Sequence, residues 1–218
     1  MTRAPFITLE GGEGCGKSTH ADLLARRLRE QGLPALLTHE PGATELGRAL
    51  RRLLADPQGP DPCPQAELLL YLADRAQHLE QVIRPALAAG QVVVCDRFAD
   101  STQVYQGMAR GLGAGRVREL NRWLCGDTWP DLTLVLDLDP ALGLARARQR
   151  QGEAGLDRLE LAGGEFHRRV REGFLELARR EPDRVRLVDA AGSRQEVARR
   201  IWELVQPLVE SWRRHREA

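Results

Sequence analysis

A glycine-rich segment near the N-terminus has the residue types and the spacing of a phosphate-binding loop. Residues 11–18 read GGEGCGKS, which fits G-x-x-x-x-G-K-S, and they follow the apolar run FITLE and precede a helical pattern. The glycines let backbone N–H groups converge on one anion, and the partial positive charge of a helix N-terminus favours a phosphate there. The segment therefore predicts a site for a nucleoside triphosphate.

Three side chains have predicted roles at that site. Lys17, the only lysine of the chain, can reach the β- and γ-phosphates, and Ser18 can coordinate Mg²⁺. Asp96 directly follows the apolar run VVVC and is well placed as a second-sphere partner of the same ion. We therefore expect ATP as co-substrate and Mg²⁺ as cofactor, with Ser18 and Asp96 at the metal.

The residue after Asp96 narrows the class of enzyme. A GTPase needs N-K-x-D to recognise guanine, and the chain has no second lysine to supply it. Motor ATPases usually place a glutamate after the metal-linked aspartate to activate water, but here Arg97 occupies that position. An arginine beside the metal suits a second phosphate, so the pair predicts a kinase with an anionic acceptor. Such an acceptor is already ionised, and catalysis reduces to alignment and charge neutralisation.

A glycine-rich stretch late in the chain predicts a mobile lid. Residues 149–165 have mixed charges and no clear hydrophobic period, and Arg146, Arg148 and Arg150 lie at or just before the start of this stretch. A kinase must keep water away from the transferred phosphoryl group, and a closing flap does so. We therefore predict a lid over about 146–165.

Short apolar runs alternate with amphipathic patterns along the chain. We expect strands at 6–10, 35–39, 92–95, 132–137 and 185–189, and helices at 18–32, 43–55, 65–90, 115–126, 141–151 and 194–215. Apolar strands separated by helices predict an α/β fold, in which helices cover both faces of a parallel sheet. We expect a single domain over residues 1–218 that binds ligands at the carboxyl ends of its strands.

The overall composition argues against several other classes of protein. The 218 residues carry a net charge of only +1, so no overall field favours nucleic acid or a membrane surface. The cysteines are too far apart for a zinc site, and no apolar run is long enough to cross a membrane. Because the N-terminal apolar run is too short for a signal peptide, the expected location is the cytoplasm.

Several segments, spread over essentially the whole chain, resemble the thymidylate kinase family, which phosphorylates dTMP with ATP. They are residues 10–19, 40–44, 70–77, 96–107, 130–150, 156–160 and 188–193. The block DRFADSTQVYQG at 96–107 is specific, since other nucleotide kinases do not share it. The resemblance implies the P-loop kinase fold, with a five-stranded parallel sheet covered by helices, and a homodimer.

The resemblance also implies which residues bind the sugar and phosphate of dTMP. Arg97 matches the arginine that holds the dTMP phosphate, Arg51 is a further contact, and Glu13 matches an acid near the 3′-hydroxyl. Tyr105 matches a tyrosine packed against C2′, where its ring leaves no room for a 2′-hydroxyl, and Gln106 lies near the same site.

A second group of residues is implied at the thymine base. Tyr71 matches the aromatic residue that stacks on thymine. Arg75 follows it on the same helix face and can donate to a base carbonyl. Ser101 and Thr102 lie where the family reads the edge of the base.

By the same resemblance, the phosphate loop, its flank and the lid hold ATP. The implied residues are Gly11, Gly12, Glu13, Gly14, Cys15, Gly16, Lys17, Ser18, Thr19 and Arg146. Positions 12–15 carry no basic residue, so the lid should supply the cation of the transfer step, with Arg150 as first choice and Arg148 in support. Lys17, Arg97 and Arg150 are then the expected catalytic residues.

Two positions depart from the usual pattern of the family. His39 occupies a position where an arginine is common, so that phosphate contact could be missing here. Cys15 replaces a frequent alanine, and a thiol at a helix N-terminus beside Lys17 should have a lowered pKa. This suggests the hypothesis that alkylation of Cys15 blocks ATP binding.

Other functions remain open at this stage. The thymine methyl group is worth only about 1–3 kcal/mol in an apolar pocket, so a kinase for another monophosphate such as dUMP is the nearest alternative. A nucleotide-binding regulator without transfer activity is a second alternative. A nucleic-acid-dependent ATPase is a third, although the balanced charge and the Asp96-Arg97 pair count against it.

Overall fold

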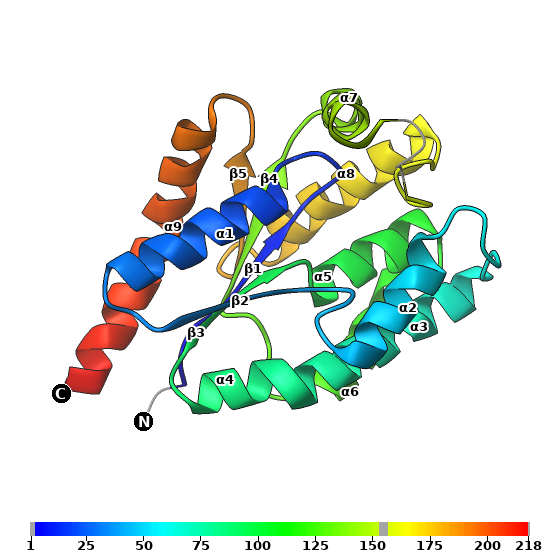
Figure 1. Cartoon of the computed structure of the whole chain (residues 1–218). Coiled ribbons are helices and arrows are strands. Elements are labelled where there is room, and N and C mark those ends of the chain that lie inside the picture. Colours follow the sequence, from blue (N-terminus) through cyan, green and yellow to red (C-terminus); the bar gives the residue numbers. More distant parts are fainter. Residues whose placement is uncertain (1–2, 153–156, 218) are drawn as a thin grey trace.

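The computed structural model describes residues 3–152 and 157–217 (Figure 1). Strands and helices alternate along the described chain. The strands are β1 (Phe6–Glu10), β2 (Ala35–His39), β3 (Val92–Asp96), β4 (Leu132–Asp137) and β5 (Val185–Asp189). The helices are α1 (Lys17–Glu30), α2 (Glu45–Ala55), α3 (Pro64–His78), α4 (Arg84–Ala88), α5 (Ala99–Thr102), α6 (Ala114–Cys125), α7 (Pro140–Gln151), α8 (Gly164–Arg180) and α9 (Arg194–Glu217), with π-helical segments η1 (Leu79–Ile83) and η2 (Gln103–Ala109).

The strands form one parallel sheet, as the alternation of apolar runs and helices predicts. Within the described residues the sheet has five strands in the order β2-β3-β1-β4-β5. The chain leaves β1 for the edge strand β2 and returns through β3, and then crosses to β4 and β5. All carboxyl ends therefore lie along one edge of the sheet, where loops from distant parts of the sequence meet.

Helices cover both faces of the sheet. In β4, Leu134 and Leu136 pack into a large core together with α1 and α9, whereas Val135 packs with α8 and η2. Because successive side chains of a strand point to opposite faces, Val135 lies on the other face of the sheet from Leu134 and Leu136. Figure 1 shows α1 and α9 side by side on one side of the strands and α8 on the other.

The structure differs from the predicted elements in three places. The helix expected at 65–90 is divided into α3, η1 and α4, and the π-helical segment lies just before Pro85, whose ring and missing N–H disturb a regular helix. Two helical stretches were not predicted, at 99–109 and in α8. Residues 153–156 of the predicted lid lie outside the described residues.

A search for membrane-spanning helices covered residues 3–152 and 157–217. None of the helices there is both long enough and apolar enough to cross a membrane.

Candidate active site

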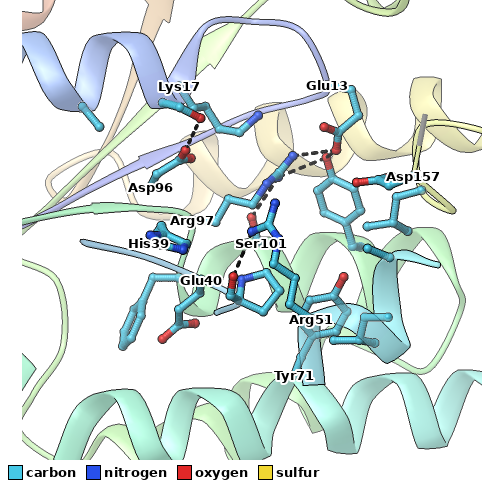
Figure 2. Close-up of a pocket in the computed structure, with 18 of the residues that line it drawn as sticks. Glu13, Lys17, His39, Glu40, Arg51, Tyr71, Asp96, Arg97, Ser101 and Asp157 are labelled. Atoms are coloured by element: carbon cyan, nitrogen blue, oxygen red, sulfur yellow. Dashed lines mark hydrogen bonds and ion pairs between the residues drawn. The ribbon is translucent and has the colours of Figure 1, made fainter. Parts of the chain in front are cut away.

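A cavity of about 470 Å³ opens at the carboxyl ends of β1, β2 and β3 (Figure 2). Most residues that the sequence analysis selected line it, although they come from nine different elements and loops. These are Glu13, Gly14, Gly16, Lys17, Ser18, Thr19, Arg51, Tyr71, Arg75, Asp96, Arg97, Ser101, Thr102, Tyr105, Gln106 and Arg150. Gly11, Gly12, Cys15 and Arg146 do not line it.

The phosphate loop has the geometry of an anion site. Gly16 has a left-handed backbone at the N-cap of α1 and offers no side-chain cap, so the first N–H groups of α1 face the loop. Lys17 Nζ donates to the carbonyl of Gly12 at 2.6 Å and is thereby held across the loop. Positive charge and backbone donors thus converge on one end of the cavity.

A pair of polar side chains beside the loop can hold a cation. The hydroxyl of Ser18 donates to Oδ2 of Asp96, which brings the end of β3 against the start of α1. The other oxygen, Asp96 Oδ1, is buried and has no hydrogen-bond partner among the described residues. A hydroxyl and a carboxylate with one uncommitted oxygen are hard ligands of the kind that Mg²⁺ prefers, so the donor set fits that ion.

The loop also packs closely against the start of α7, a contact that the sequence analysis missed. Gly14 has a φ of +65°, and a Cβ there would lie 1.9 Å from the carbonyl oxygen of Gly143. In the other direction, a Cβ at Gly143 would lie 2.2 Å from the carbonyl oxygen of Glu13. Both positions therefore require glycine, and the Gly143 in the helical pattern 141–151 was the available signal.

Cys15 is buried beside Lys17, whose Nζ lies 3.5 Å from its Sγ. Its side chain is buried in the large core, and its Sγ donates to the carbonyl of Gly12 at 3.0 Å. A thiol used as a donor inside the core is shielded from reagents in solvent. The structure therefore gives no support to the hypothesis that Cys15 is an accessible reactive thiol.

Arg97, Glu13 and Tyr105 form a compact cluster in the lining of the cavity. Figure 2 shows Arg97 and Glu13 pointing toward each other. Arg97 Nη2 donates to Glu13 Oε1 at 2.5 Å, and the Tyr105 hydroxyl donates to the same oxygen at 2.8 Å. Burial alone would raise the pKa of Glu13, but the charges of Arg97 and Lys17 lower that pKa to about 2. Glu13 is therefore an ionised hydrogen-bond acceptor at any physiological pH.

The backbone of Arg97 has an unusual conformation that directs its side chain into the cavity. Its φ of +67° lies in the left-handed region, which L-residues with a Cβ seldom adopt. The guanidinium Nη1 lies 3.2 Å from the carbonyl oxygen of Gly11 and 3.3 Å from Ser101 Oγ. Strain of this kind is common where a side chain must be aimed at a ligand.

A buried ion pair with Glu40 holds the side chain of Arg75. Its side chain is only 1% exposed, and Nη2 lies 2.8 Å from Glu40 Oε2. It also donates to Asn121 Oδ1 and to Thr102 Oγ1, both at 2.8 Å. Its Nε is buried and has no hydrogen-bond partner among the described residues.

Glu40 and Glu67 are site residues that the sequence analysis did not single out. Glu40 is shared between Arg75 and His78, whose Nδ1 lies 2.9 Å from Glu40 Oε1. Glu67 accepts from Gln106 Nε2 at 2.6 Å and pairs with Arg110 at 3.1 Å. Glu40 was within the quoted block 40–44, but its partners lie more than thirty residues away, and no local pattern reveals such pairs.

Three further predicted residues border the cavity. Tyr71 lines it, and burial of the phenol, aided by the negative charge of Glu67, raises its pKa, so the hydroxyl is neutral. Arg51 lies on α2, and its Nη1 donates to the carbonyl of Pro41 at 2.9 Å. His39, the departure from the family pattern, also lines the cavity.

Part of the predicted lid rests against the cavity. Arg150 lies 3.6 Å from Glu160, and its side chain is 61% exposed. Arg158 donates to the carbonyls of Asp56 and Gly59, at 2.5 and 3.3 Å. This end of the predicted lid is thereby docked on the loop that follows α2, over the opening of the cavity.

Fold and site together define the class of protein. A phosphate loop, a site suited to a hard cation and a buried arginine a short way beyond them are the components of a P-loop enzyme that transfers phosphoryl groups. A nucleophile-activating glutamate does not follow Asp96, whose neighbour is Arg97. The class is therefore a P-loop kinase with a second anionic substrate.

Comparisons with known proteins identify the family. The profile described as Thymidylate kinase matches residues 9–201. A thymidylate kinase of Synechococcus sp. (strain JA-2-3B'a(2-13)) is 56% identical over 204 residues, which cover 94% of this chain and 95% of that protein. A thymidylate kinase of Pseudomonas putida (strain W619) is 52% identical over 208 residues, with 95% and 99% covered.

A solved structure agrees with these sequence matches. The crystal structure of thymidylate kinase from Ehrlichia chaffeensis superimposes with a TM-score of 0.74 at 33% identity, and covers 94% of this chain and 99% of that one. The chain belongs to the thymidylate kinase family, and it is a phosphotransferase that phosphorylates dTMP with ATP. The alternatives of a dUMP kinase or an inactive regulator are not favoured.

Proposed function

We propose that the two substrates bind at opposite ends of the cavity, ATP on the phosphate loop and the phosphate of dTMP on Arg97. The observation that carries the proposal is the position of Arg97. Its guanidinium lies in the same cavity as Lys17 and is joined to the phosphate loop through Glu13. Two phosphates bound to these cations would face each other across one space.

At the donor end, backbone N–H groups of residues 11–18 hold the ATP phosphates, and Lys17 neutralises the transferred group. The neighbouring Thr19 and the lid residue Arg146 complete the ATP site, with Arg146 near adenine. Ser18 and Asp96 hold Mg²⁺, for which Asp96 keeps one buried oxygen uncommitted. The ion supplies charge neutralisation on the phosphate oxygens when it is bound.

At the acceptor end, the phosphate of dTMP binds Arg97, with Arg51 beside it. The ionised Glu13 accepts a hydrogen bond from the 3′-hydroxyl, which agrees with its low pKa of about 2. Tyr105, fixed by its bond to Glu13, packs against C2′ and excludes a 2′-hydroxyl. The geometry of these residues supports a deoxyribonucleotide as acceptor.

The thymine base lies between Tyr71 and the floor of the cavity. Tyr71 stacks on the ring, and Arg75, which also lines the cavity, donates to a base carbonyl. Thr102 acts mainly by holding Arg75, since its hydroxyl accepts from that guanidinium. Ser101 and Gln106 are held by Glu10 and Glu67, so both act at the edge of this site.

Transfer then requires alignment rather than proton removal. The dTMP phosphate is already an ionised nucleophile, and an in-line attack on the γ-phosphoryl group needs positive charge around the transferred oxygens. Lys17, Arg97 and the lid residue Arg150 supply it, with Arg148 in support. The docked lid keeps water out during the transfer.

Three wider features belong to the same proposal. Residues 1–218 form a single domain with a lid over about 146–165, which the continuous sheet supports. The chain acts in the cytoplasm and binds no nucleic acid. It pairs as a homodimer, and Trp123, which is 80% exposed on α6, is an apolar residue suited to an interface.

The test compares acceptors and then removes Arg97. ADP formation from ATP and Mg²⁺ is measured with dTMP, dUMP, UMP, dCMP, AMP and GMP, and dTMP should give by far the fastest rate. Arg97→Ala should raise the KM of dTMP about a hundredfold and leave the KM of ATP within about threefold, because a charge-assisted phosphate contact is lost on one side only. Equal losses for both substrates would show that Arg97 is not the acceptor clamp.

A further inference from the structure

Glu10, the last residue of β1, is a carboxyl group with no place in the proposed reaction. Its side chain is 0% exposed, and it does not line the cavity. Carboxyl groups are rarely buried unless specific partners hold them, because loss of hydration is costly. Its partners therefore indicate what it does.

Both oxygens of Glu10 contact the segment that follows Arg97. Oε1 accepts the backbone N–H of Phe98 at 2.7 Å, and Oε2 lies 2.5 Å from the hydroxyl of Ser101. The same Ser101 oxygen lies 3.3 Å from Arg97 Nη1. Glu10 thus touches the residue directly after Arg97 and one of the groups around its guanidinium.

The end of β1 surrounds Arg97 on several sides. The carbonyl of Leu9 accepts the N–H of Arg97 at 3.0 Å, and the carbonyl of Gly11 lies 3.2 Å from its guanidinium. Glu10, between these two residues, holds Phe98. A left-handed backbone at a residue with a Cβ persists only where neighbouring contacts impose it. Three consecutive residues of β1 and its exit impose it here.

We infer that Glu10 is a positioning residue for the acceptor phosphate: its buried carboxyl fixes Phe98 and Ser101, and so holds Arg97 in the left-handed conformation that aims its guanidinium into the cavity. The inference rests on the proposed role of Arg97 as the dTMP phosphate ligand. Glu10 itself touches no substrate.

The charge state of Glu10 decides which variants are informative. Burial, and then the nearby charge of Asp100, raises the pKa of Glu10 to about 8, so the carboxyl is mostly neutral at pH 7. A glutamine has the same shape as the neutral acid: its oxygen can accept from Phe98, and its amide can donate to Ser101. A methionine has similar length but offers neither group.

The experiment measures the KM and the equilibrium Kd of dTMP, and the KM of ATP, at pH 7. Glu10→Met should weaken dTMP about tenfold and leave ATP within about twofold, and Glu10→Gln should restore dTMP to within about threefold of the unmodified chain. Thr8→Val is the matched control, because Thr8 is equally buried on β1 and loses only its 2.9 Å contact with Thr133. Its dTMP affinity should be unchanged.

Three outcomes would overturn the inference. The first is equal weakening of ATP and dTMP by Glu10→Met, and the second is a loss in Glu10→Met no larger than that in Thr8→Val. The third is a Glu10→Gln variant as defective as Glu10→Met. If Glu10→Met does not fold, Ser101→Ala replaces it, because this variant removes the hydroxyl between Glu10 and Arg97. Ser101→Ala should weaken the binding of dTMP about threefold. Unchanged dTMP binding in Ser101→Ala would also overturn the inference.

Arg97→Ala, measured in parallel, separates this inference from the proposal on which it rests. If Arg97→Ala leaves dTMP binding intact, the proposed phosphate ligand is wrong. If Arg97→Ala weakens dTMP but Glu10→Met does not, only the role of Glu10 is wrong.

Discussion

The two ends of the cavity, proposed above as donor and acceptor ends, hold positive charge by different means. At the proposed donor end, the available groups are mainly backbone N–H groups of a glycine-rich loop, and Arg150 of α7 is largely exposed. At the proposed acceptor end, Arg75 is buried and Arg97 is half-buried, and each is already paired with a carboxylate, Glu40 and Glu13. The chain itself therefore holds both arginines in place.

On the proposed assignment, the difference follows from what each substrate brings. ATP brings a long chain of phosphates, which a glycine-rich loop and a closing lid surround. dTMP brings one phosphate and a base, so the proposed acceptor end holds two cations in a low-dielectric interior beforehand. Buried charges are stable only when they are paired, which explains why acids accompany both arginines.

The largest predicted effect is on the free energy of unfolding, and it compares one arginine from each end of the cavity. Arg75→Met should lower the free energy of unfolding by about 3–5 kcal/mol, because it leaves Glu40 buried without its main partner. Arg150→Met removes an exposed arginine and should cost no more than about 0.5 kcal/mol. Urea denaturation of both variants measures the difference. Equal losses would mean that the two ends do not differ in this way.

The second prediction concerns the activity of an Arg150 variant. Arg150→Ala should lower kcat about a hundredfold with little change in the KM of dTMP, because a cation is lost from the transferred group. Arg179→Ala, an exposed arginine of α8 paired with Glu176 and distant from the cavity lining, is the control and should keep full activity. A normal kcat in Arg150→Ala would transfer the role to Arg146 or Arg148.

The third prediction concerns the pH dependence of stability that Asp74, a buried carboxyl group of α3 near Glu40, produces. Burial, and then the nearby Glu40, raises the pKa of Asp74 from 3.8 to about 6. Between these values the native state binds more protons than the unfolded state, so stability falls as pH rises through the window. Asp74→Asn keeps the acceptor for the Gly42 N–H and removes this loss of stability. Its free energy of unfolding, relative to that of the unmodified chain, should therefore rise by up to about 3 kcal/mol from pH 4 to pH 7.

Thermal or urea unfolding at a series of pH values checks this prediction. Leu69→Ala, at an exposed position of the same helix α3, removes no ionisable group and provides the control, so its offset from the unmodified chain should stay constant with pH. A constant offset for Asp74→Asn as well would show that Asp74 carries no such cost.

The smallest effect concerns the sugar. Tyr105→Ala should lower the preference for dTMP over its ribonucleotide about tenfold, because the ring no longer fills the space beside C2′. Tyr105→Phe keeps the ring and loses only the contacts of the hydroxyl with Glu13, Arg97 and the Gly11 carbonyl, so its preference should be retained. The ratio of kcat/KM for the two nucleotides measures both. An unchanged ratio in Tyr105→Ala would remove the steric explanation.

Much of the fold could be predicted because its signals are local. The five strands agree with the predicted runs to within one residue at their ends, since strands buried on both faces read as continuous apolar runs. The region 99–109 was missed because its helical turns are short and irregular and have no clear period. Helix α8 was missed because it begins at Gly164 without a side-chain cap, inside the stretch predicted as lid.

The sequence by itself determined the phosphate-loop motif and the parallel sheet, because each depends on neighbouring residues, and the role of Arg97 beside a metal site stays a prediction. Only the tertiary structure decided how these groups are held: that Glu13 reaches Arg97, that Glu40 serves Arg75 and His78, and that Glu10 contacts Phe98. Glu10 ends β1, and Glu13, Glu40, Arg97 and Phe98 lie after β1, β2 or β3, which the order β2-β3-β1-β4-β5 places side by side, whereas Arg75 and His78 lie on α3. Buried polar groups must find partners in space, and spatial neighbours of this kind leave no periodic pattern along the chain.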